Sequence, residues 1–256
     1  MMTLMHFTLT VLGSGTMMPT KDRFPSAYLV ECDDTRVLVD CGHMAMARLI
    51  ERGINLHDID AVVLTHFHAD HLSHLLPFIF ARFVDAKERG LTEKNLRIIG
   101  PKSLTERYRT LRSVMWPEPH EPAITITEVE TEAQKIGPVT FTPFSVIHSP
   151  LFPCLGYRIE AEGKTLVYSG DMGCEQEKGF EENLKNADVL LIEAGSDTGS
   201  KSHCTPESAI AFGKNAGAKR ILLTHISAHR LPLIQKAVDA ADVNVSIATD
   251  GLVIDV

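Results

Sequence analysis

The segment Leu64-Thr65-His66-Phe67-His68-Ala69-Asp70-His71 decides the fold of this chain. It gathers three imidazoles and one carboxylate directly after the apolar run 61–64, which predicts a strand. Histidines two positions apart in an extended chain point to the same side, and a helix that starts near Asp70 would turn Asp70 and His71 toward the same space. Neutral imidazole and carboxylate are ligands that zinc-like divalent ions prefer. The segment therefore indicates a metal site at a strand end rather than a polar loop that happens to be rich in histidine.

Three more candidate ligands stand at the ends of other strand-like runs. His148 follows the run 139–147, Asp171 follows the run 165–169, and His225 follows the run 220–224. Open α/β sheets place ligand sites in the loops at strand ends, although a single polar residue there is more often structural. Together with the first cluster they make seven nitrogen and oxygen ligands. Because zinc usually takes three or four protein ligands, that number fits two ions better than one.

The spacing His-x-His-x-Asp-His of this segment resembles the signature of the metallo-β-lactamase fold superfamily. Other parts of the family pattern follow in order, namely Leu12-Gly13-Ser14-Gly15-Thr16, Asp40-Cys41-Gly42, His148, Asp171 and His225. The resemblance runs from about residue 8 to the C-terminus. It implies an α/β fold, a four-layer αββα sandwich of two mixed β-sheets flanked by helices. It also implies that His66, His68 and His148 bind one ion, that Asp70, His71 and His225 bind the other, and that Asp171 bridges them.

The segment 202–207, Ser-His-Cys-Thr-Pro-Glu, resembles the ribonuclease Z-like and phosphodiesterase branch of that superfamily. This branch carries a His-x-Thr-type loop here, and His203 matches its histidine, which the resemblance implies meets the phosphate and protonates the leaving oxygen. The alternative for His203 is to flank the helix that follows. Ribonuclease Z proper inserts a long tRNA-binding arm between the ligands that match His148 and Asp171. This chain has room there only for two strands and a turn, so tRNA processing is not expected unless a partner subunit supplies the arm.

These features predict a dinuclear metal-dependent hydrolase, foremost a phosphodiesterase acting on a small or cyclic nucleotide-type phosphodiester or on an RNA end. Zn²⁺ is the favoured metal, with Mn²⁺ or Fe²⁺ as alternatives. Two such ions can activate water and neutralise a phosphoryl group, while Asp70 takes the proton and His203 assists the leaving alcohol. The sequence leaves open a carboxyl-ester, lactone or sulfate-ester hydrolase on the same metals. A diiron redox protein is disfavoured, because related redox proteins carry Glu where this motif has His68.

Length and composition predict one hydrolase domain over residues 1–256, with two similar halves at about 1–122 and 123–256. The net charge of −8 disfavours a nucleic-acid partner, and the locally dense basic residues of 82–112 are interleaved with acidic ones. A small anionic substrate is expected instead, because bound cations supply the local charge. No apolar stretch approaches the ~20 residues of a membrane span, and the N-terminus lacks the pattern of a signal peptide. With five scattered cysteines, these features predict a cytoplasmic protein with no membrane partner, and the relatives suggest a homodimer.

The hydrophobic patterns predict the following elements. Helices are expected over 44–52, 72–89, 103–115, 180–185, 205–216 and 231–241. Strands are expected over 6–12, 27–31, 35–39, 61–65, 96–99, 124–129, 139–147, 156–161, 165–169, 189–193, 220–224, 244–247 and 252–256. Ser103 and Glu106 have the spacing of a capping box, and Thr205 is placed to cap the helix that follows it. Trp116 is either a lid residue that stacks on a substrate ring or a core residue.

Overall fold

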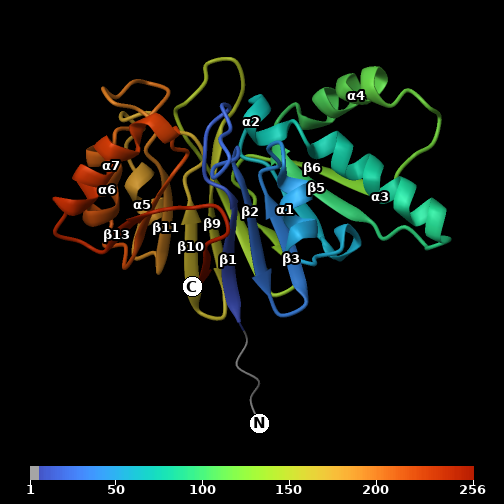
Figure 1. The fold of residues 1–256 in the computed structure, drawn as a ribbon, viewed down its shortest axis with the longest axis horizontal. Helices are drawn as coiled ribbons and strands as arrows, with labels where there is room; N and C mark the ends of the chain where they lie inside the picture. The colour runs from blue at the N-terminus through green and yellow to red at the C-terminus, as the bar shows by residue number, and fades with distance from the viewer. Residues whose placement is uncertain (1–5) are drawn as a thin grey trace, which may run out of the picture.

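A computed structural model describes residues 6–256, so that the N-terminal expectations for residues 1–5 lie outside the described residues. Two seven-stranded sheets lie face to face in the middle of the molecule, and helices cover both outer sides (Figure 1). The first sheet has the strand order β14-β1-β2-β3-β4-β5-β6, and the second has the order β13-β12-β11-β10-β9-β8-β7. The predicted four-layer αββα sandwich is confirmed. Within residues 6–256, every helix is too short or too polar to cross a membrane.

The first sheet is antiparallel at one side and parallel at the other. Its strands are β1 (Phe7–Gly13), β2 (Ala27–Cys32), β3 (Thr35–Val39), β4 (Ala61–Val63), β5 (Leu96–Pro101), β6 (Ile124–Val129) and β14 (Val253–Asp255). Strands β14 to β3 pair antiparallel, and β3 to β6 pair parallel. The helical segments of this half are α1 (Ala45–Glu51), η1 (Leu56–Asp58), α2 (Ala69–Leu72), α3 (Leu75–Arg89) and α4 (Leu104–Met115). Figure 1 shows α1, α3 and α4 on one outer side of the sandwich.

The second sheet repeats this mixture of pairings. Its strands are β7 (Gln134–Ile136), β8 (Val139–Ser145), β9 (Leu155–Ala161), β10 (Lys164–Tyr168), β11 (Val189–Glu193), β12 (Ile221–Thr224) and β13 (Val245–Ile247). Strands β7 to β10 pair antiparallel, and β10 to β13 pair parallel. Helical segments α5 (Phe180–Leu184), α6 (Pro206–Asn215), η2 (Ala228–Arg230) and α7 (Leu231–Asp239) belong to this half. The sequence pattern divides the halves near residue 122. However, β6 pairs with β5, so the chain passes from the first sheet to the second between β6 and β7, and it returns to the first sheet with β14.

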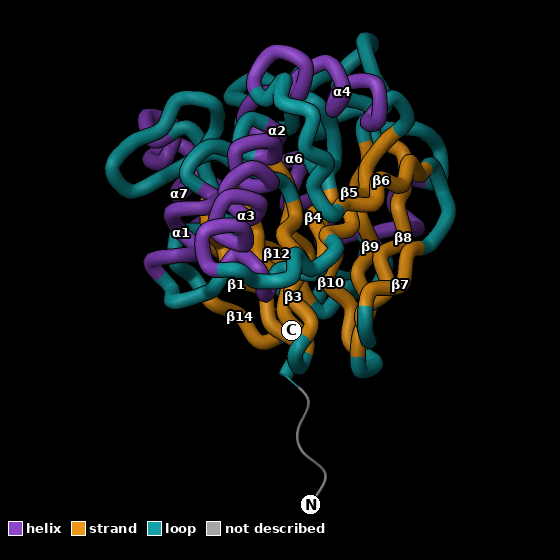
Figure 2. The backbone as a smooth tube through the Cα atoms, turned by 90° about the vertical axis from the view of Figure 1, so that its right-hand side faces the viewer, coloured by secondary structure: helices purple, strands orange, loops and turns teal. Residues whose placement is uncertain are grey.

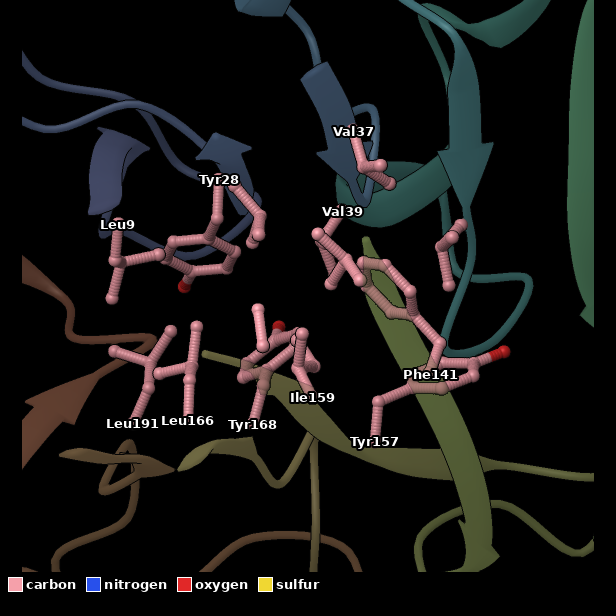
Figure 3. Packing of buried hydrophobic residues seen from close by; sticks show 14 of the residues in the cluster. Leu9, Tyr28, Val37, Val39, Phe141, Tyr157, Ile159, Leu166, Tyr168 and Leu191 are labelled. Carbon is pink, nitrogen blue, oxygen red and sulfur yellow. The ribbon is translucent and has the colours of Figure 1, made fainter. Parts of the chain in front are cut away.

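The space between the sheets is filled by apolar side chains that alternate with residues facing the helices. In β2, Tyr28 and Val30 pack toward the other sheet, whereas Leu29 packs under the helices. Figure 3 shows Tyr28, Val37 and Val39 of the first sheet opposite Tyr168 and Phe141 of the second. Because burying apolar surface stabilises by about 25 cal/mol per Å², this interface is a main source of stability. It fixes the sheets so that their strand ends meet at a common edge.

That common edge is where the parallel strands of both sheets end. Strands β3 to β6 and β10 to β13 each point their carboxyl ends toward the edge at which α2 lies (Figure 1). The side view shows the C-terminus at the opposite edge (Figure 2). Loops at the carboxyl ends of parallel strands are the usual place for ligands.

The structure corrects one sequence expectation about α4 and decides between two alternatives for the residue that follows it. The capping box is wrong: Ser103 has a left-handed φ of 72° and its side chain makes no cap hydrogen bond. Instead, the carboxylate of Glu128, at the end of β6, accepts hydrogen bonds from the N–H groups of Ser103 (3.1 Å) and Thr105 (2.9 Å). Trp116 is 2% exposed and packs on the Phe80 ring at 4.8 Å, so it is a core residue and not a lid.

Candidate metal centre

All seven predicted ligand residues converge at the edge where the strands end. They form two groups, His66, His68, His148 and Asp171, and Asp70, His71, Asp171 and His225. In each group, one candidate ligand atom per residue lies within 4.8 Å of the others. Asp171 belongs to both groups, which is the position predicted for a bridging ligand.

Local structure explains this convergence. Strand β4 ends at Val63, the loop that follows carries His66 and His68, and α2 begins at Ala69 and turns the next two side chains inward. The second sheet contributes the rest from three loops, in which His148 follows β8, Asp171 follows β10 and His225 follows β12. His225 has a left-handed φ of 57°, a conformation that non-glycine residues rarely adopt and that often occurs at functional sites. Each group thus takes side chains from both sheets.

The geometry of these atoms fits metal ions. His68 Nδ1 lies 3.1 Å from His66 Nε2 and 3.0 Å from His148 Nε2, so that three ring nitrogens converge on one point. In the other group, His71 Nε2 and Asp171 Oδ1 are buried and lie 3.3 Å apart, but neither makes a well-oriented hydrogen bond within residues 6–256. Buried polar atoms nearly always have a partner, so these atoms call for one. Imidazole nitrogens and carboxylate oxygens are the donors that zinc prefers.

The electrostatics of the two groups also suit cations. Burial holds the pKa of His66 well below its usual value, which keeps this imidazole in the neutral form that binds metals. Burial also lowers the pKa of His71, but the charges of Asp171 and Asp40 outweigh it and raise this pKa well above the usual value. The second group therefore gathers positive charge around its carboxylates. A bound metal ion would displace that proton and supply the charge.

Residues behind the ligands fix their orientation. The Asp40 carboxylate is fully buried and accepts hydrogen bonds from His71 Nδ1 (2.7 Å), the Thr65 N–H (2.8 Å) and the Tyr168 hydroxyl (3.0 Å). His148 Nδ1 lies 2.5 Å from the carbonyl oxygen of Ser202, to which it donates. In both histidines these hydrogen bonds engage Nδ1 and leave Nε2 to face the centre. Metal-binding histidines are usually oriented in this way, by a hydrogen bond from the ring nitrogen that does not bind the metal. Sequence reasoning noted the Asp40 turn but missed this role.

His203 lies beside the ligands as predicted. Its ring stacks on the His225 ring with centroids 5.5 Å apart and an interplanar angle of 9°. Its Nδ1 lies 2.6 Å from Glu193 Oε1, and Glu193, at the end of β11, is 0% exposed. Burial raises the pKa of Glu193, and its hydrogen bond to His203 partly offsets this effect. Sequence reasoning missed Glu193. The available signal was an acidic residue that closes the apolar run Val189–Glu193.

A pocket of about 220 Å³ opens onto this centre. Candidate ligands, the predicted acid His203 and residues from three other segments line it. The lining residues are Thr16, Met17, Met18, His68, Asp70, Asp171, Gly195, His203, His225 and Arg230. The pocket gives a small substrate direct access to both ligand groups. The remaining histidines of the sequence do not line it.

Comparison with known proteins identifies relatives over nearly the whole chain. The family model described as the beta-lactamase superfamily domain matches residues 35–226. A protein named ribonuclease Z from Methanopyrus kandleri is 29% identical over 287 residues, which cover 98% of this chain and 98% of that protein. The probable metallo-hydrolase YhfI of Bacillus subtilis is 30% identical over 227 residues, which cover 85% and 86% of the two chains.

Two solved structures extend the comparison to the fold. The crystal structure of YhfI superposes with a TM-score of 0.82 at 28% identity and covers 98% of this chain and 99% of that one. A crystal structure described as a new diphosphatase from the PhnP family has a TM-score of 0.77 at 26% identity and covers 98% of each chain. The similarity therefore includes both sheets and all the loops of the candidate centre.

Proposed function

Because the chain belongs to the beta-lactamase superfamily and is a metal-dependent hydrolase, we propose that it hydrolyses a small or cyclic nucleotide-type phosphodiester, or an RNA end, with two divalent metal ions. One observation carries this proposal: two ligand groups share Asp171, and His203 lies beside them, backed by a buried carboxylate. The relatives named ribonuclease Z and diphosphatase support phosphoryl chemistry. A cytoplasmic location and a homodimer stay predictions.

The two ligand groups would each hold one ion, with zinc as the favoured metal and Mn²⁺ or Fe²⁺ as alternatives. When bound, two divalent cations supply Lewis acidity to the phosphoryl group and to the attacking water. The substrate class that suits this centre is a small anion, because the cations offset the carboxylates that line the pocket. The net charge of −8 makes a long nucleic acid the less favoured substrate.

Asp70 and His203 perform the proton transfers in this proposal. Burial would raise the pKa of Asp70, but the hydrogen bond from His225 and the charge of His71 outweigh it, so that the carboxylate is ionised. Asp70 Oδ2 faces His225 Nε2 at 3.2 Å on the side of the candidate ligands, which would leave the other oxygen of Asp70 to accept a proton from water. Glu193 holds His203 through Nδ1, which leaves Nε2 as the atom that protonates the leaving oxygen.

The test combines metal content with a panel of substrates. Elemental analysis of the purified protein should find two zinc-like ions per chain, and the protein should hydrolyse bis(p-nitrophenyl) phosphate in preference to p-nitrophenyl acetate and p-nitrophenyl sulfate. The variant His68→Ala should lose metal and activity together. The matched control is His57→Ala. His57 lies outside the metal centre, where its Nε2 is 3.0 Å from Asp85 Oδ2, so this variant should keep both its metal and its activity.

Other outcomes would replace the proposal with a different function. Two ions with turnover of the acetate or the sulfate alone would establish a carboxyl-ester or sulfate-ester hydrolase on the same centre. Iron without any hydrolysis would support a redox protein. Full activity in the His68→Ala variant would show that His68 is not a metal ligand.

A further inference from the structure

The pocket at the metal centre contains one residue with a permanent positive charge. This residue is neither a candidate ligand nor part of the proton-transfer pair. Among the residues that line this pocket, Arg230 is the single lysine or arginine. The volume of about 220 Å³ lies below the ~300–1,000 Å³ typical of small-molecule sites, so the substrate must be compact where it enters. A substrate bound at the ligand groups therefore has Arg230 in the same small pocket.

The Arg230 guanidinium is held in place before any substrate binds. Its Nη1 donates to the carbonyl oxygen of Gly195, and its Nε lies 2.8 Å from Asp197 Oδ1. The Gly195 N–H in turn donates to Glu193 at 3.1 Å, so the guanidinium is fixed to the same loop that orients His203. A group that is already ordered loses little entropy when it binds a ligand.

The fixed guanidinium keeps donors for a ligand. No hydrogen bond within residues 6–256 engages Nη2 of Arg230, and the side chain is 31% exposed. Arginine presents five N–H donors in a planar fork, which matches the oxygens of a phosphate group. These contacts can be bidentate and are roughly twice as strong as neutral hydrogen bonds.

The other walls of the pocket carry no second lysine or arginine. Met17 and Met18, 49% and 74% exposed, come from the loop that follows β1 and form an apolar rim. Asp70 and Asp171 line the floor and repel an anion except where cations neutralise them. An additional negative group would thus settle on the Arg230 side and the organic part of the substrate on the methionine side.

We propose that Arg230 determines specificity by binding a second phosphate group, so that the preferred substrates are compact phosphodiesters that carry another phosphate near the scissile one. This inference rests on the proposed phosphodiesterase function and narrows its substrate class. The competing role for Arg230 is purely structural, a clamp between η2 and the loop at Gly195 and Asp197. A clamp would affect all substrates equally, whereas a phosphate-binding residue affects only those with the second phosphate.

The first experiment compares two substrates that differ only in that group. Thymidine 5′-(p-nitrophenyl phosphate) is assayed with and without a 3′-phosphate. The wild type should prefer the 3′-phosphorylated compound. Arg230→Gln should lower the ratio of the two kcat/KM values, with the 3′-phosphate over without it, by about tenfold or more, the effect of losing one charge-assisted contact.

Two variants serve as comparisons in this experiment. Arg230→Lys keeps the charge but lacks the planar guanidinium, so its preference for the 3′-phosphorylated compound should fall between those of the wild type and Arg230→Gln. The matched control is Arg89→Gln, which removes the same charge from the exposed end of α3 and should leave the preference unchanged. Equal losses on both substrates, or no loss on either, would overturn the inference and leave Arg230 as a clamp.

The second experiment does not depend on turnover. Calorimetry on the metal-loaded protein measures binding of methylenediphosphonate, which has two anionic groups, and of methylphosphonate, which has one. Arg230→Gln should weaken binding of the diphosphonate by about tenfold and of the monophosphonate by less than about twofold. If the wild type shows this selectivity but hydrolyses no diester, the proposed function fails while the assignment of Arg230 stands. If Arg230→Gln binds both probes as the wild type does, the assignment itself fails.

Discussion

The pair formed by the His203 imidazole and the Glu193 carboxylate sets the direction in which the imidazole can donate. Because Glu193 engages Nδ1, a proton for the leaving oxygen resides on Nε2. We expect His203→Ala to lower kcat by a factor that grows with the pKa of the leaving alcohol. The loss should be about tenfold or less for p-nitrophenolate and about 10²–10⁴-fold for an alkyl group, which cannot leave unprotonated. Measuring kcat over a series of aryl and alkyl diesters tests this dependence.

Two further variants complete that experiment. Glu193→Gln keeps an acceptor for the Gly195 and Cys204 N–H groups, both 3.1 Å away, and should show the same trend with smaller losses. His120→Ala, on the exposed segment after α4, should behave as the wild type. A loss in His203→Ala that is equal for all leaving groups would mean that His203 binds the phosphate without donating a proton.

A second residue-scale prediction concerns Asp40, which orients His71 from behind. Asp40→Asn replaces one acceptor oxygen by a donor, so the hydrogen bond to His71 Nδ1 is lost or reversed. Loss of such a partner typically weakens metal binding 10–100-fold, and we expect about that loss for one of the two ions. Competition with a chromophoric chelator measures the two affinities. Asp34→Asn in the exposed β2–β3 turn is the control, and unchanged affinities for both ions in Asp40→Asn would contradict the assigned role.

The sequence could predict the residues that face the centre but not the residues that hold them. The ligand motif is local, and polar residues at strand ends identify the other candidates, so all seven, together with His203, were expected. Glu193 and Asp40 act only through contacts with residues far away in the chain. An acidic residue that ends a buried strand must find a partner, but which partner depends on how the strands are ordered.

At the scale of elements, the start of α4 shows how a distant residue replaces a local cap. The N–H groups of Ser103 and Thr105 donate to the Glu128 carboxylate, and the Thr105 hydrogen bond lowers the pKa of Glu128 below its usual 4.5. Glu128→Ala should lower the free energy of unfolding by about 0.5–2 kcal/mol, the usual cost of a lost cap. Because the pKa is depressed in the folded state, the difference from wild type should be present near neutral pH and vanish as the pH falls through that pKa.

Urea denaturation measures this difference, and hydrogen exchange locates it. Faster exchange should be confined to the first turn of α4. The control is Glu130→Ala, whose carboxylate pairs with Lys102 on the surface and caps no helix. If Glu128→Ala and Glu130→Ala cost the same, the cap contributes nothing beyond a surface ion pair.

Most elements could be predicted from the sequence, and the misses have local causes. Thr205 caps α6 as expected, because its hydroxyl accepts from the Ser208 N–H at 3.2 Å. The three-residue strand β7 was missed, since Gln134–Ile136 is too short to show alternation. The expected helix 72–89 is observed as α3 (Leu75–Arg89), and a separate short helix, α2 (Ala69–Leu72), precedes it and turns the motif residues inward.

At the scale of the whole molecule, the order of strands along the chain does not reveal which sheet receives the last one. β14 returns to pair with β1 in the first sheet, with Leu9 opposite Ile254. The preceding loop carries Asp250, whose carboxylate accepts hydrogen bonds from the Ser14 and Phe24 N–H groups, both 2.8 Å away. The two ends of the chain thus jointly build the loop that forms the methionine rim of the pocket. Such pairing depends on contacts between distant residues, which hydrophobic periodicity does not encode.

The last prediction concerns the cohesion of the two sheets. The first sheet supplies four of the ligands, and the second supplies His148, Asp171 and His225, so ions in both groups would link the sheets at the edge where their strands end. Removing the metal should lower stability by about 4 kcal/mol at a free metal concentration 1,000-fold above Kd. For a domain of this size that corresponds to roughly 8–16 °C in Tm.

Calorimetry after dialysis against a chelator, followed by titration with zinc, measures that change. The His68→Ala variant, which should bind less metal, should recover only part of the increase, while His57→Ala should recover all of it. The fall in Tm should exceed that for loss of a surface ion, because these ions would bind buried side chains from both sheets. If elemental analysis shows that all metal is gone and Tm is unchanged, the ions do not link the sheets. The proposed ligand groups would then have to be assigned anew.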